Sequence, residues 1–252
     1  MSKREDRIAQ LIELSNKHDN LHIKDAAKLL NVSEMTIRRD LSHAVSYPIY
    51  LLGGYIVYNK EYNTISQYFM SAQQLRNISE KRHIGRIAAN LIQNNEMIFF
   101  DCGTTIPYVI EHIPAQIYFT GLCYSLNVFQ ALQKRGNCKI ILCGGIFESD
   151  NSIFTLINEL SPLDVICPSK SFISAAGISL KGVTCFNLPE VSWKIKAISR
   201  SNTNVLVADS SKFDGVKSAC FAQLADFDII ISEHVNDKYL SYCKKNNITI
   251  YQ

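Results

Sequence analysis

The stretch at residues 25–42 limits most strongly what this chain can fold into, because it reads as two short helices joined by a tight turn. Residues 25–30 form the first helix, with an apolar stripe made by Ala26, Leu29 and Leu30. Asn31-Val32 supply the turn, and Ser33 is a good N-cap for the second helix. Two helices separated by a turn of this length are typical of a helix-turn-helix.

The second helix has one apolar and one polar face. Ile37 and Leu41 share the apolar face, because residues four apart lie on the same side of a helix. The other side suits the DNA major groove, where arginine bonds bidentately to guanine and apolar groups touch thymine methyls. The predicted DNA-binding residues are Ser33, Met35, Thr36, Arg38, Arg39, Ser42 and His43. For this helix taken alone, a solvated polar face is the alternative interpretation.

The flanking segments complete a small domain. Upstream, the apolar residues Ile8, Leu11, Ile12 and Leu14 indicate an amphipathic helix that closes a three-helix core. Downstream, residues 49–58 are rich in β-formers and broken by Gly53-Gly54, as a hairpin wing would be. We therefore predict a winged helix-turn-helix domain at 1–58, a polar connector at 59–75 and a second domain at 76–252.

Strand and helix patterns alternate through the second domain. Apolar strand-like runs lie at 97–100, 117–120, 139–142, 163–167, 205–208 and 229–232, with helical stretches at 125–134 and 190–200. Short apolar strands that alternate with helices favour a mainly parallel sheet covered on both faces. The predicted fold class is α/β, with the winged helix-turn-helix domain followed by a mainly parallel three-layer domain.

Ligands of such sheets usually bind beyond the carboxyl ends of the strands. The loop at 101–105, Asp-Cys-Gly-Thr-Thr, follows an apolar strand and offers a flexible glycine, two hydroxyl groups and helix-terminal amides to an anion. With other strand-end residues and one helical lysine, the predicted effector-binding set is Asp101, Gly103, Thr104, Thr105, Gly144, Gly145, Lys194, Asp209, Ser211 and Lys212. We expect a small polar ligand carrying a phosphate.

Charge and cysteine content narrow the class of protein. Residues 1–60 hold nine Lys and Arg against seven Asp and Glu, so DNA binding must rest on placed residues rather than on bulk charge. None of the eight cysteines forms a C-x-x-C pair, which disfavours a metal site, and we expect no cofactor.

Without a signal peptide or an apolar run of about 20 residues, we expect a cytoplasmic protein with no membrane partner.

The motifs resemble those of the DeoR family of bacterial transcriptional regulators. In the first domain these are Ala-Ala-Lys-Leu-Leu-Asn-Val-Ser, which ends at Ser33, and the following Met-Thr-Ile-Arg-Arg-Asp-Leu. In the second they are Asp-x-Gly-Thr-Thr from Asp101, Gly144-Gly145, Glu-x-x-x-Lys ending at Lys194, and Asp-Ser-Ser-Lys-Phe from Asp209.

This resemblance implies a sensor domain related to ribose-phosphate isomerases and glucosamine-phosphate deaminases. It also implies a sequence-specific transcriptional regulator of carbohydrate metabolism, and we expect a repressor. Such a regulator binds double-stranded operator DNA and is controlled by a phosphorylated sugar or a related metabolite. The wing departs from the family pattern, because Tyr50, Leu52 and Tyr55 stand where Arg and His are common. Since one winged helix reads only a short half-site, we expect a homodimer or a larger even assembly.

Two other functions stay open from the sequence. The fold resemblance alone allows a sugar-phosphate isomerase or deaminase with an added N-terminal domain. We nevertheless expect no enzyme and assign no catalytic residue, because no base, acid and nucleophile set is evident. A redox-responsive regulator is the second alternative, acting through Cys102 or Cys123, since the helix start beside Cys102 can lower the pKa of its thiol.

Overall fold

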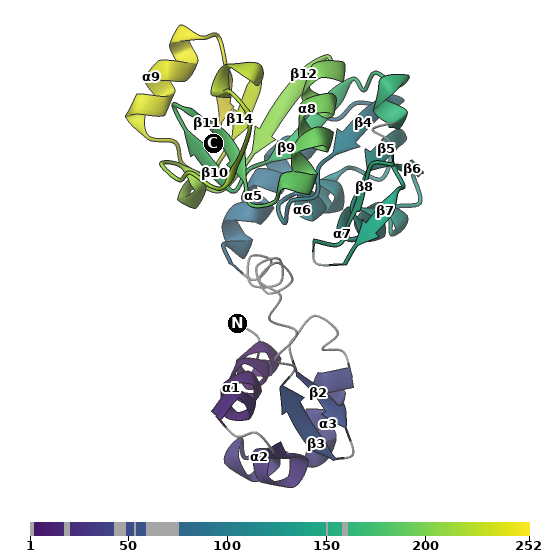
Figure 1. Cartoon of the computed structure of the whole chain (residues 1–252), viewed down its shortest axis with the longest axis vertical. Coiled ribbons are helices and arrows are strands. Elements are labelled where there is room, and N and C mark those ends of the chain that lie inside the picture. The colour runs from purple at the N-terminus through teal and green to yellow at the C-terminus, as the bar shows by residue number, and fades with distance from the viewer. Residues whose placement is uncertain are drawn as a thin grey trace. The chain divides into compact units, whose positions relative to one another are not determined.

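The computed structural model describes residues 3–17, 21–42, 49–52, 54–58, 76–149, 151–157 and 161–252. The chain splits into two compact units, Met1–Gln73 and Gln74–Gln252 (Figure 1). The predicted connector at 59–75 lies outside the described residues, so the three-part division stays a prediction. No described helix has the length and apolar character needed to cross a membrane.

The first unit is a winged helix-turn-helix, as predicted. Its helices are α1 (Lys3–Lys17), α2 (Ile23–Leu29) and α3 (Glu34–Ser42), and its strands are β1 (Leu21–His22), β2 (Ile49–Leu52) and β3 (Tyr55–Tyr58). The strands form an antiparallel sheet in the order β1-β3-β2. The core buries Ile8, Leu11, Leu21, Ile23, Ala26, Ala27, Ile37, Ile49 and Ile56.

The predicted apolar stripe of α2 was wrong in one member. Leu29 is 61 % exposed, while Ile23, Ala26 and Ala27 are buried. The helix begins two residues earlier than the pattern suggested, where the His22 ring accepts a hydrogen bond from the Lys24 amide at 3.2 Å. The i, i+3, i+4 face therefore starts at residue 23, which turns residue 29 toward solvent.

The second unit contains a seven-stranded, wholly parallel sheet. Its strands are β4 (Glu96–Phe100), β5 (Phe119–Cys123), β6 (Cys138–Leu142), β9 (Lys170–Ser174), β12 (Thr203–Val207), β14 (Ile229–Ile231) and β15 (Thr249–Tyr251). They lie in the order β15-β14-β12-β9-β4-β5-β6. The run expected at 117–120 overlaps β5 only at residues 119 and 120, because this strand continues to Cys123.

Helices cover both faces of this sheet, which confirms the predicted fold class (Figure 1). One face packs against α5 (Ile78–Ala89), α6 (Ile106–His112) and α7 (Leu126–Gln133). The other packs against α8 (Val191–Arg200) and α9 (Asp237–Lys245). Strand β4 is apolar on both sides, since Ile98 and Phe100 enter one core and Phe99 enters the other, so both faces of the sheet must be covered.

Smaller elements complete the second unit. A three-stranded antiparallel sheet holds β10 (Gly177–Ser179), β11 (Gly182–Cys185) and β13 (Ala219–Ala222), and a separate hairpin pairs β7 (Ile146–Glu148) with β8 (Ile153–Thr155). Short 3₁₀ turns lie at η2 (Pro162–Asp164), η3 (Leu188–Glu190), η4 (Ser210–Lys212) and η5 (Leu224–Asp226). The strand expected at 163–167 was wrong, because Pro162 and a capping box at Ser161 start η2 there instead.

Candidate functional site

The face of α3 that the sequence assigns to DNA is exposed. Met35 is 73 % exposed, and Arg38 and Arg39 are also exposed, whereas Ile37 is buried on the opposite side. Thr36 is half-buried, and its amide donates to the Ser33 hydroxyl at 3.1 Å. Ser33 therefore caps α3, and the two arginines with Met35 form the outward surface.

Asp40 fixes how α3 is rotated, a role that the sequence did not reveal. Its side chain is almost fully buried and accepts a hydrogen bond from Arg7 of α1 at 2.8 Å. Arg4, one turn earlier on α1, donates to the Asp40 carbonyl at 3.2 Å. This inward-facing carboxylate holds the neighbouring Arg38 and Arg39 outward.

The remaining predicted DNA contacts are less defined. Ser42 is the last residue of α3, but its side chain is not among those that the structure describes. His43 lies outside the described residues. In the wing, the side chains of Tyr50 and Leu52 also lie outside the described set. Tyr55 is about half exposed and packs edge-on against His22, with ring centroids 4.9 Å apart. The role of the wing in DNA binding stays untested.

The chain order of the parallel sheet places its switch point between β4 and β9. From β4 the chain proceeds to β5 and β6, and then returns to β9 on the other side of β4. Ligands of open α/β sheets bind in the crevice beyond the carboxyl ends at such a point. Asp101 directly follows β4 and meets Ser174, the last residue of β9, whose amide donates to the carboxylate at 2.9 Å.

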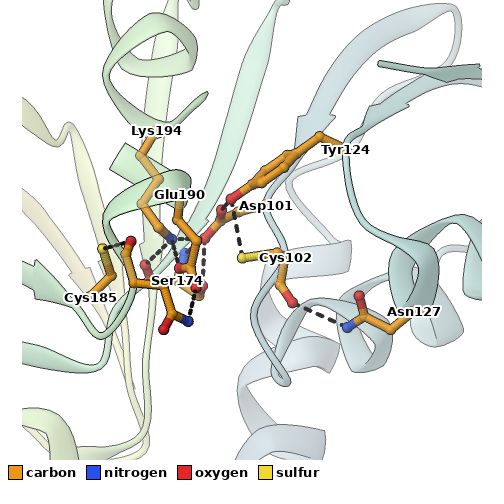
Figure 2. A network of polar contacts seen from close by, with 9 residues as sticks. Asp101, Cys102, Tyr124, Asn127, Ser174, Cys185, Glu190 and Lys194 are labelled. Carbon is orange, nitrogen blue, oxygen red and sulfur yellow. Dashed lines mark hydrogen bonds and ion pairs between the residues drawn. The ribbon is translucent and has the colours of Figure 1, made fainter. Parts of the chain in front are cut away.

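Asp101 is the centre of a buried network (Figure 2). Tyr124 donates to one carboxylate oxygen at 2.6 Å, and the Ser174 hydroxyl and the Lys194 ammonium donate to the other. Burial alone would raise the pKa of Asp101, but the Lys194 charge and these hydrogen bonds outweigh it and hold the pKa below its usual range. Asp101 is thus an ionised carboxylate whose two oxygens already accept several donors.

Lys194 is the counter-ion of this carboxylate. It is buried on α8, and its ammonium lies 3.7 Å from Glu190 as well. Burial would lower the pKa of Lys194, but the Asp101 charge outweighs that effect and raises the pKa above its usual value. Two carboxylates face one ammonium, so this trio adds no net positive charge at the carboxyl edge.

The loop after Asp101 is tightly packed. A Cβ at Gly103 would lie 2.1 Å from the Ser174 hydroxyl, so only glycine fits there. Thr104 is half-buried and Thr105 is buried at the start of α6. Asn127 of α7 holds this loop by donating to the Cys102 carbonyl at 3.1 Å, as Figure 2 shows. The predicted anion loop is therefore a fixed element at the switch point.

A second polar cluster joins the η4 turn to the start of α5. The Asp209 carboxylate is buried and accepts from Asn77, the N-cap of α5, at 2.8 Å. It also accepts the amide and the hydroxyl of Ser211, and Lys212 lies 3.9 Å away. Asp209, Ser211 and Lys212 are thus brought together as predicted. Because α5 begins here, its first turn lies at the carboxyl edge of the sheet.

Lys81, in that first turn of α5, is a residue that the sequence reading missed. Its side chain is only 1 % exposed. Burial lowers its pKa to about 8, with Asp209 opposing the shift and Lys212 adding to it. Burial is thus the main reason why the charged form of Lys81 is disfavoured, and a bound anion would favour that charged form.

Gly144 and Gly145 are exposed at the end of β6. A Cβ at Gly145, whose φ is +155°, would lie 1.9 Å from the Thr155 carbonyl oxygen. Glycine is therefore required there to start the β7–β8 hairpin. Neither glycine is among the residues of the Asp101 or Asp209 clusters.

The redox alternative loses its chemical basis. Cys102 is buried, and burial followed by the Asp101 charge raises the pKa of its thiol well above the usual value, opposite to the lowering that the nearby helix start could cause. Burial likewise raises the pKa of Cys123 to about 12. Thiols in this state carry little thiolate, which is the reactive form.

A pocket of about 420 Å³ lies at the opposite, amino edge of the sheet. Its lining includes Asn95, Tyr118 and Lys139, which precede or begin the strands β4, β5 and β6. It includes none of the predicted effector-binding residues. The switch point and the Asp209 cluster lie at the other edge.

Comparisons with known proteins agree with this geometry. Residues 7–60 match the DeoR-like helix-turn-helix domain and residues 76–234 match the DeoR C terminal sensor domain. The chain is 46 % identical over 251 residues to the deoxyribose operon repressor of Escherichia coli (strain K12), covering 99 % of this chain and 98 % of that one. It is 26 % identical over 257 residues to the HTH-type transcriptional repressor GlcR of Bacillus subtilis (strain 168), covering 98 % and 95 %.

Among solved structures, ribose 5 phosphate isomerase A from Neisseria gonorrhoeae is similar over 53 % of this chain and 52 % of that chain. Its TM-score is 0.36 and its sequence identity 19 %, too low to bear on fold or function. The two matched domains and the 46 % identity across nearly the whole length are decisive: the chain belongs to the DeoR family of DNA-binding transcriptional regulators.

Proposed function

We propose that the protein represses an operon for the use of a sugar and releases its operator when a phosphorylated form of that sugar binds. The 46 % identical relative is a deoxyribose operon repressor, which favours deoxyribose as the sugar and a deoxyribose phosphate as the ligand. Operator DNA and such a metabolite meet in the cytoplasm, where we place the protein.

The cluster of Lys81, Asp209 and Lys212 at the carboxyl edge carries this proposal. Lys81 is buried, and the Lys212 charge helps to lower its pKa. Both α5 and α6 start at this edge, because α5 leads into β4 and α6 follows it, and we place the ligand between the first turn of α5 and the 101–105 loop. A phosphate there would meet two cations and the hydroxyls of Thr104 and Thr105.

Asp101 and Lys194 take a supporting role in this scheme. They neutralise each other inside the network and hold the loop against β9, so we assign them to positioning rather than to direct charge on the phosphate. We keep Gly103, Thr104, Thr105, Asp209, Ser211 and Lys212 as the predicted binding set and add Lys81. Gly144 and Gly145 contribute by shaping the hairpin start.

An enzyme of the isomerase type is the second candidate, and the site geometry disfavours it. A general base needs a pKa near the working pH and a free lone pair. Asp101 has a lowered pKa and already accepts several donors. Incubating the protein with deoxyribose 5-phosphate and ribose 5-phosphate should leave both unchanged, and turnover would refute this part of the proposal.

The experiment for the binding site is calorimetry with phosphorylated sugars. Wild-type protein should bind 2-deoxyribose 5-phosphate, and Lys212→Ala and Thr104→Val should each bind it at least about tenfold more weakly, the loss expected for one charge-assisted contact. Lys134→Ala is the matched control, because Lys134 is exposed at the C-cap of α7, at the amino edge. Equal binding by Lys212→Ala and wild type would show that the site is misplaced.

We also propose a homodimer or a larger even assembly, since paired winged helices read two half-sites. Light scattering at micromolar concentration should give at least twice the chain mass of 28.5 kDa. A monomer that binds operator tightly would contradict this.

A further inference from the structure

Three buried polar oxygens lie without hydrogen-bond partners at the start of α7. They are the Ser125 hydroxyl, the Asn127 carboxamide oxygen and the Asn151 carboxamide oxygen, none of which finds a partner within the described part of the chain. Ser125 is fully buried and Asn151 is 8 % exposed. Buried polar groups are nearly always paired, so three orphans in one region call for a partner from outside the protein.

The backbone brings these residues together. The Leu126 amide donates to the Ser152 carbonyl at 2.8 Å, and Ser125 forms an isolated antiparallel bridge with Ile153, at the start of β8. Ser125 and Asn127 therefore sit beside Asn151, where α7 meets the β7–β8 hairpin. The hydrogen bond from Asn127 to the Cys102 carbonyl ties this junction to the loop that carries Gly103 and Thr104.

The orientation of Asn127 is fixed by its neighbour. A carbonyl oxygen only accepts, so the side-chain NH₂ must face the Cys102 carbonyl and the Oδ1 must point elsewhere. Ser125 occupies the N-cap of α7, yet its hydroxyl makes no capping hydrogen bond. The usual structural use of a serine at this position, capping the helix, is therefore not made.

The orphan atoms define the chemistry of their partner. Both carboxamide oxygens only accept, so the partner must donate hydrogen bonds. A phosphate at neutral pH brings mainly acceptor oxygens and cannot satisfy them. Sugar hydroxyl groups both donate and accept, and they match this set.

We infer that Ser125, Asn127 and Asn151 form the subsite for the hydroxyl groups of the ligand, next to the loop that receives its phosphate. This inference rests on the proposed function, because it concerns the sugar part of the same sugar-phosphate ligand. It makes these residues the ones that distinguish one sugar phosphate from another, whereas the phosphate contacts are common to all of them.

Ser125→Ala is the sharpest test. The hydroxyl makes no hydrogen bond within the described protein, so its removal should leave the melting temperature unchanged or slightly raised. Affinity for 2-deoxyribose 5-phosphate should fall on the order of tenfold relative to affinity for inorganic phosphate. Asn127→Ala is less informative, because it also removes the hydrogen bond to Cys102.

Ser201→Ala is the matched control. Ser201 carries another buried hydroxyl without a partner, but it lies at the C-cap of α8, at the amino edge of the sheet. This variant should bind both probes like wild type. The sole tryptophan, Trp193, donates to the Phe154 carbonyl of the hairpin at 2.7 Å, so its fluorescence can report the titrations.

The outcomes separate this inference from the proposed function. If wild type binds deoxyribose 5-phosphate and Ser125→Ala binds it equally well, buried water occupies the site and the inference is overturned alone. If wild type binds inorganic phosphate but none of the sugar phosphates, the proposed function fails and the inference falls with it. A loss in Ser125→Ala that Ser201→Ala does not share supports both.

Discussion

Asp40 of α3, which is buried, accepts a hydrogen bond from the partly buried Arg7 of α1 at 2.8 Å. The pair joins α3, the predicted DNA-binding helix, to α1. Because residues 38, 39 and 40 are consecutive, an inward Asp40 sets the direction of both neighbouring arginines. The direction of the predicted DNA-binding surface therefore depends on a contact made by a buried carboxylate.

This contact predicts a stability effect. Asp40→Ala leaves the mostly buried Arg7 guanidinium without its partner, which should cost roughly 1–3 kcal/mol. Thermal unfolding of the first unit should show the loss, and Asp25→Ala on the surface of α2 serves as the control. An unchanged unfolding temperature in Asp40→Ala would mean that the pair does not hold α3.

The arginines themselves predict a change in operator binding. Arg39→Ala should cost about 1–3 kcal/mol of operator affinity if Arg39 bonds bidentately to a base. Arg38→Ala should mainly flatten the dependence on salt by about one unit of logarithmic slope, as expected for a lost phosphate contact. Titrations at several salt concentrations measure both, with the exposed Arg200→Ala in the sensor domain as control. A double variant that binds like wild type would refute the assignment.

The Asp101–Lys194 ion pair predicts a pH dependence of unfolding. The pKa of Asp101 is lowered in the fold, so its contribution is present above about pH 4 and is lost as pH falls through the folded pKa. The pKa of Lys194 is raised, so its contribution is present below about pH 10.5 and is lost as pH rises through the folded pKa. Denaturant unfolding of wild type should show a plateau between these limits.

Lys194→Met should change the shape of that profile. An unpaired, buried Asp101 would prefer its proton, so stability should fall as pH rises above about 4, by roughly 3–5 kcal/mol at neutral pH. Lys196→Met on the same helix is the control, because its partner Asp164 is exposed and solvent screening leaves such a pair with little effect on stability. Equal profiles for the two variants would contradict the central role of the network.

Lys81 predicts proton uptake on ligand binding. Its pKa of about 8 leaves it partly neutral at pH 8–9, and an adjacent phosphate would raise that pKa. Binding of deoxyribose 5-phosphate at this pH should therefore take up a fraction of a proton, because the phosphate group itself is already fully ionised. Calorimetry in buffers of different ionisation enthalpy measures the uptake, which Lys81→Met should abolish. Equal uptake by that variant would place the phosphate elsewhere.

Local patterns in the sequence predicted much of this protein. The exposed face of α3 follows from helical periodicity, and the apolar run of β4 with its Gly-Thr-Thr loop marks a strand end at the switch point. The polar cluster at Asp209 also follows directly from the end of β12. Each of these features depends on residues that are neighbours in the chain.

Features that depend on distant residues were missed. The central strand β9 was missed because its sequence contains polar residues, which are unusual in a buried strand. One of them, Ser171, donates from its hydroxyl to the Asn204 side chain on the next strand at 2.7 Å. Lys81 in a first helical turn reads as a surface residue, and only the fold around it reveals its burial. Asp40 likewise has the sequence pattern of a surface residue, and only the fold shows that it is bonded to Arg7 of α1. Burial of a charge is a tertiary property that no short motif records.

If the sensor domain controls operator binding, a sugar phosphate bound there must change operator affinity. Operator affinity should be measured by fluorescence anisotropy, with DNA from upstream of the sugar operon, with and without saturating deoxyribose 5-phosphate. The sugar phosphate should weaken operator binding by about 5–150-fold, and operator DNA should weaken sugar-phosphate binding by the same factor. Equal operator affinity with and without the bound sugar phosphate would contradict this prediction, since a ligand that favours neither state shifts nothing.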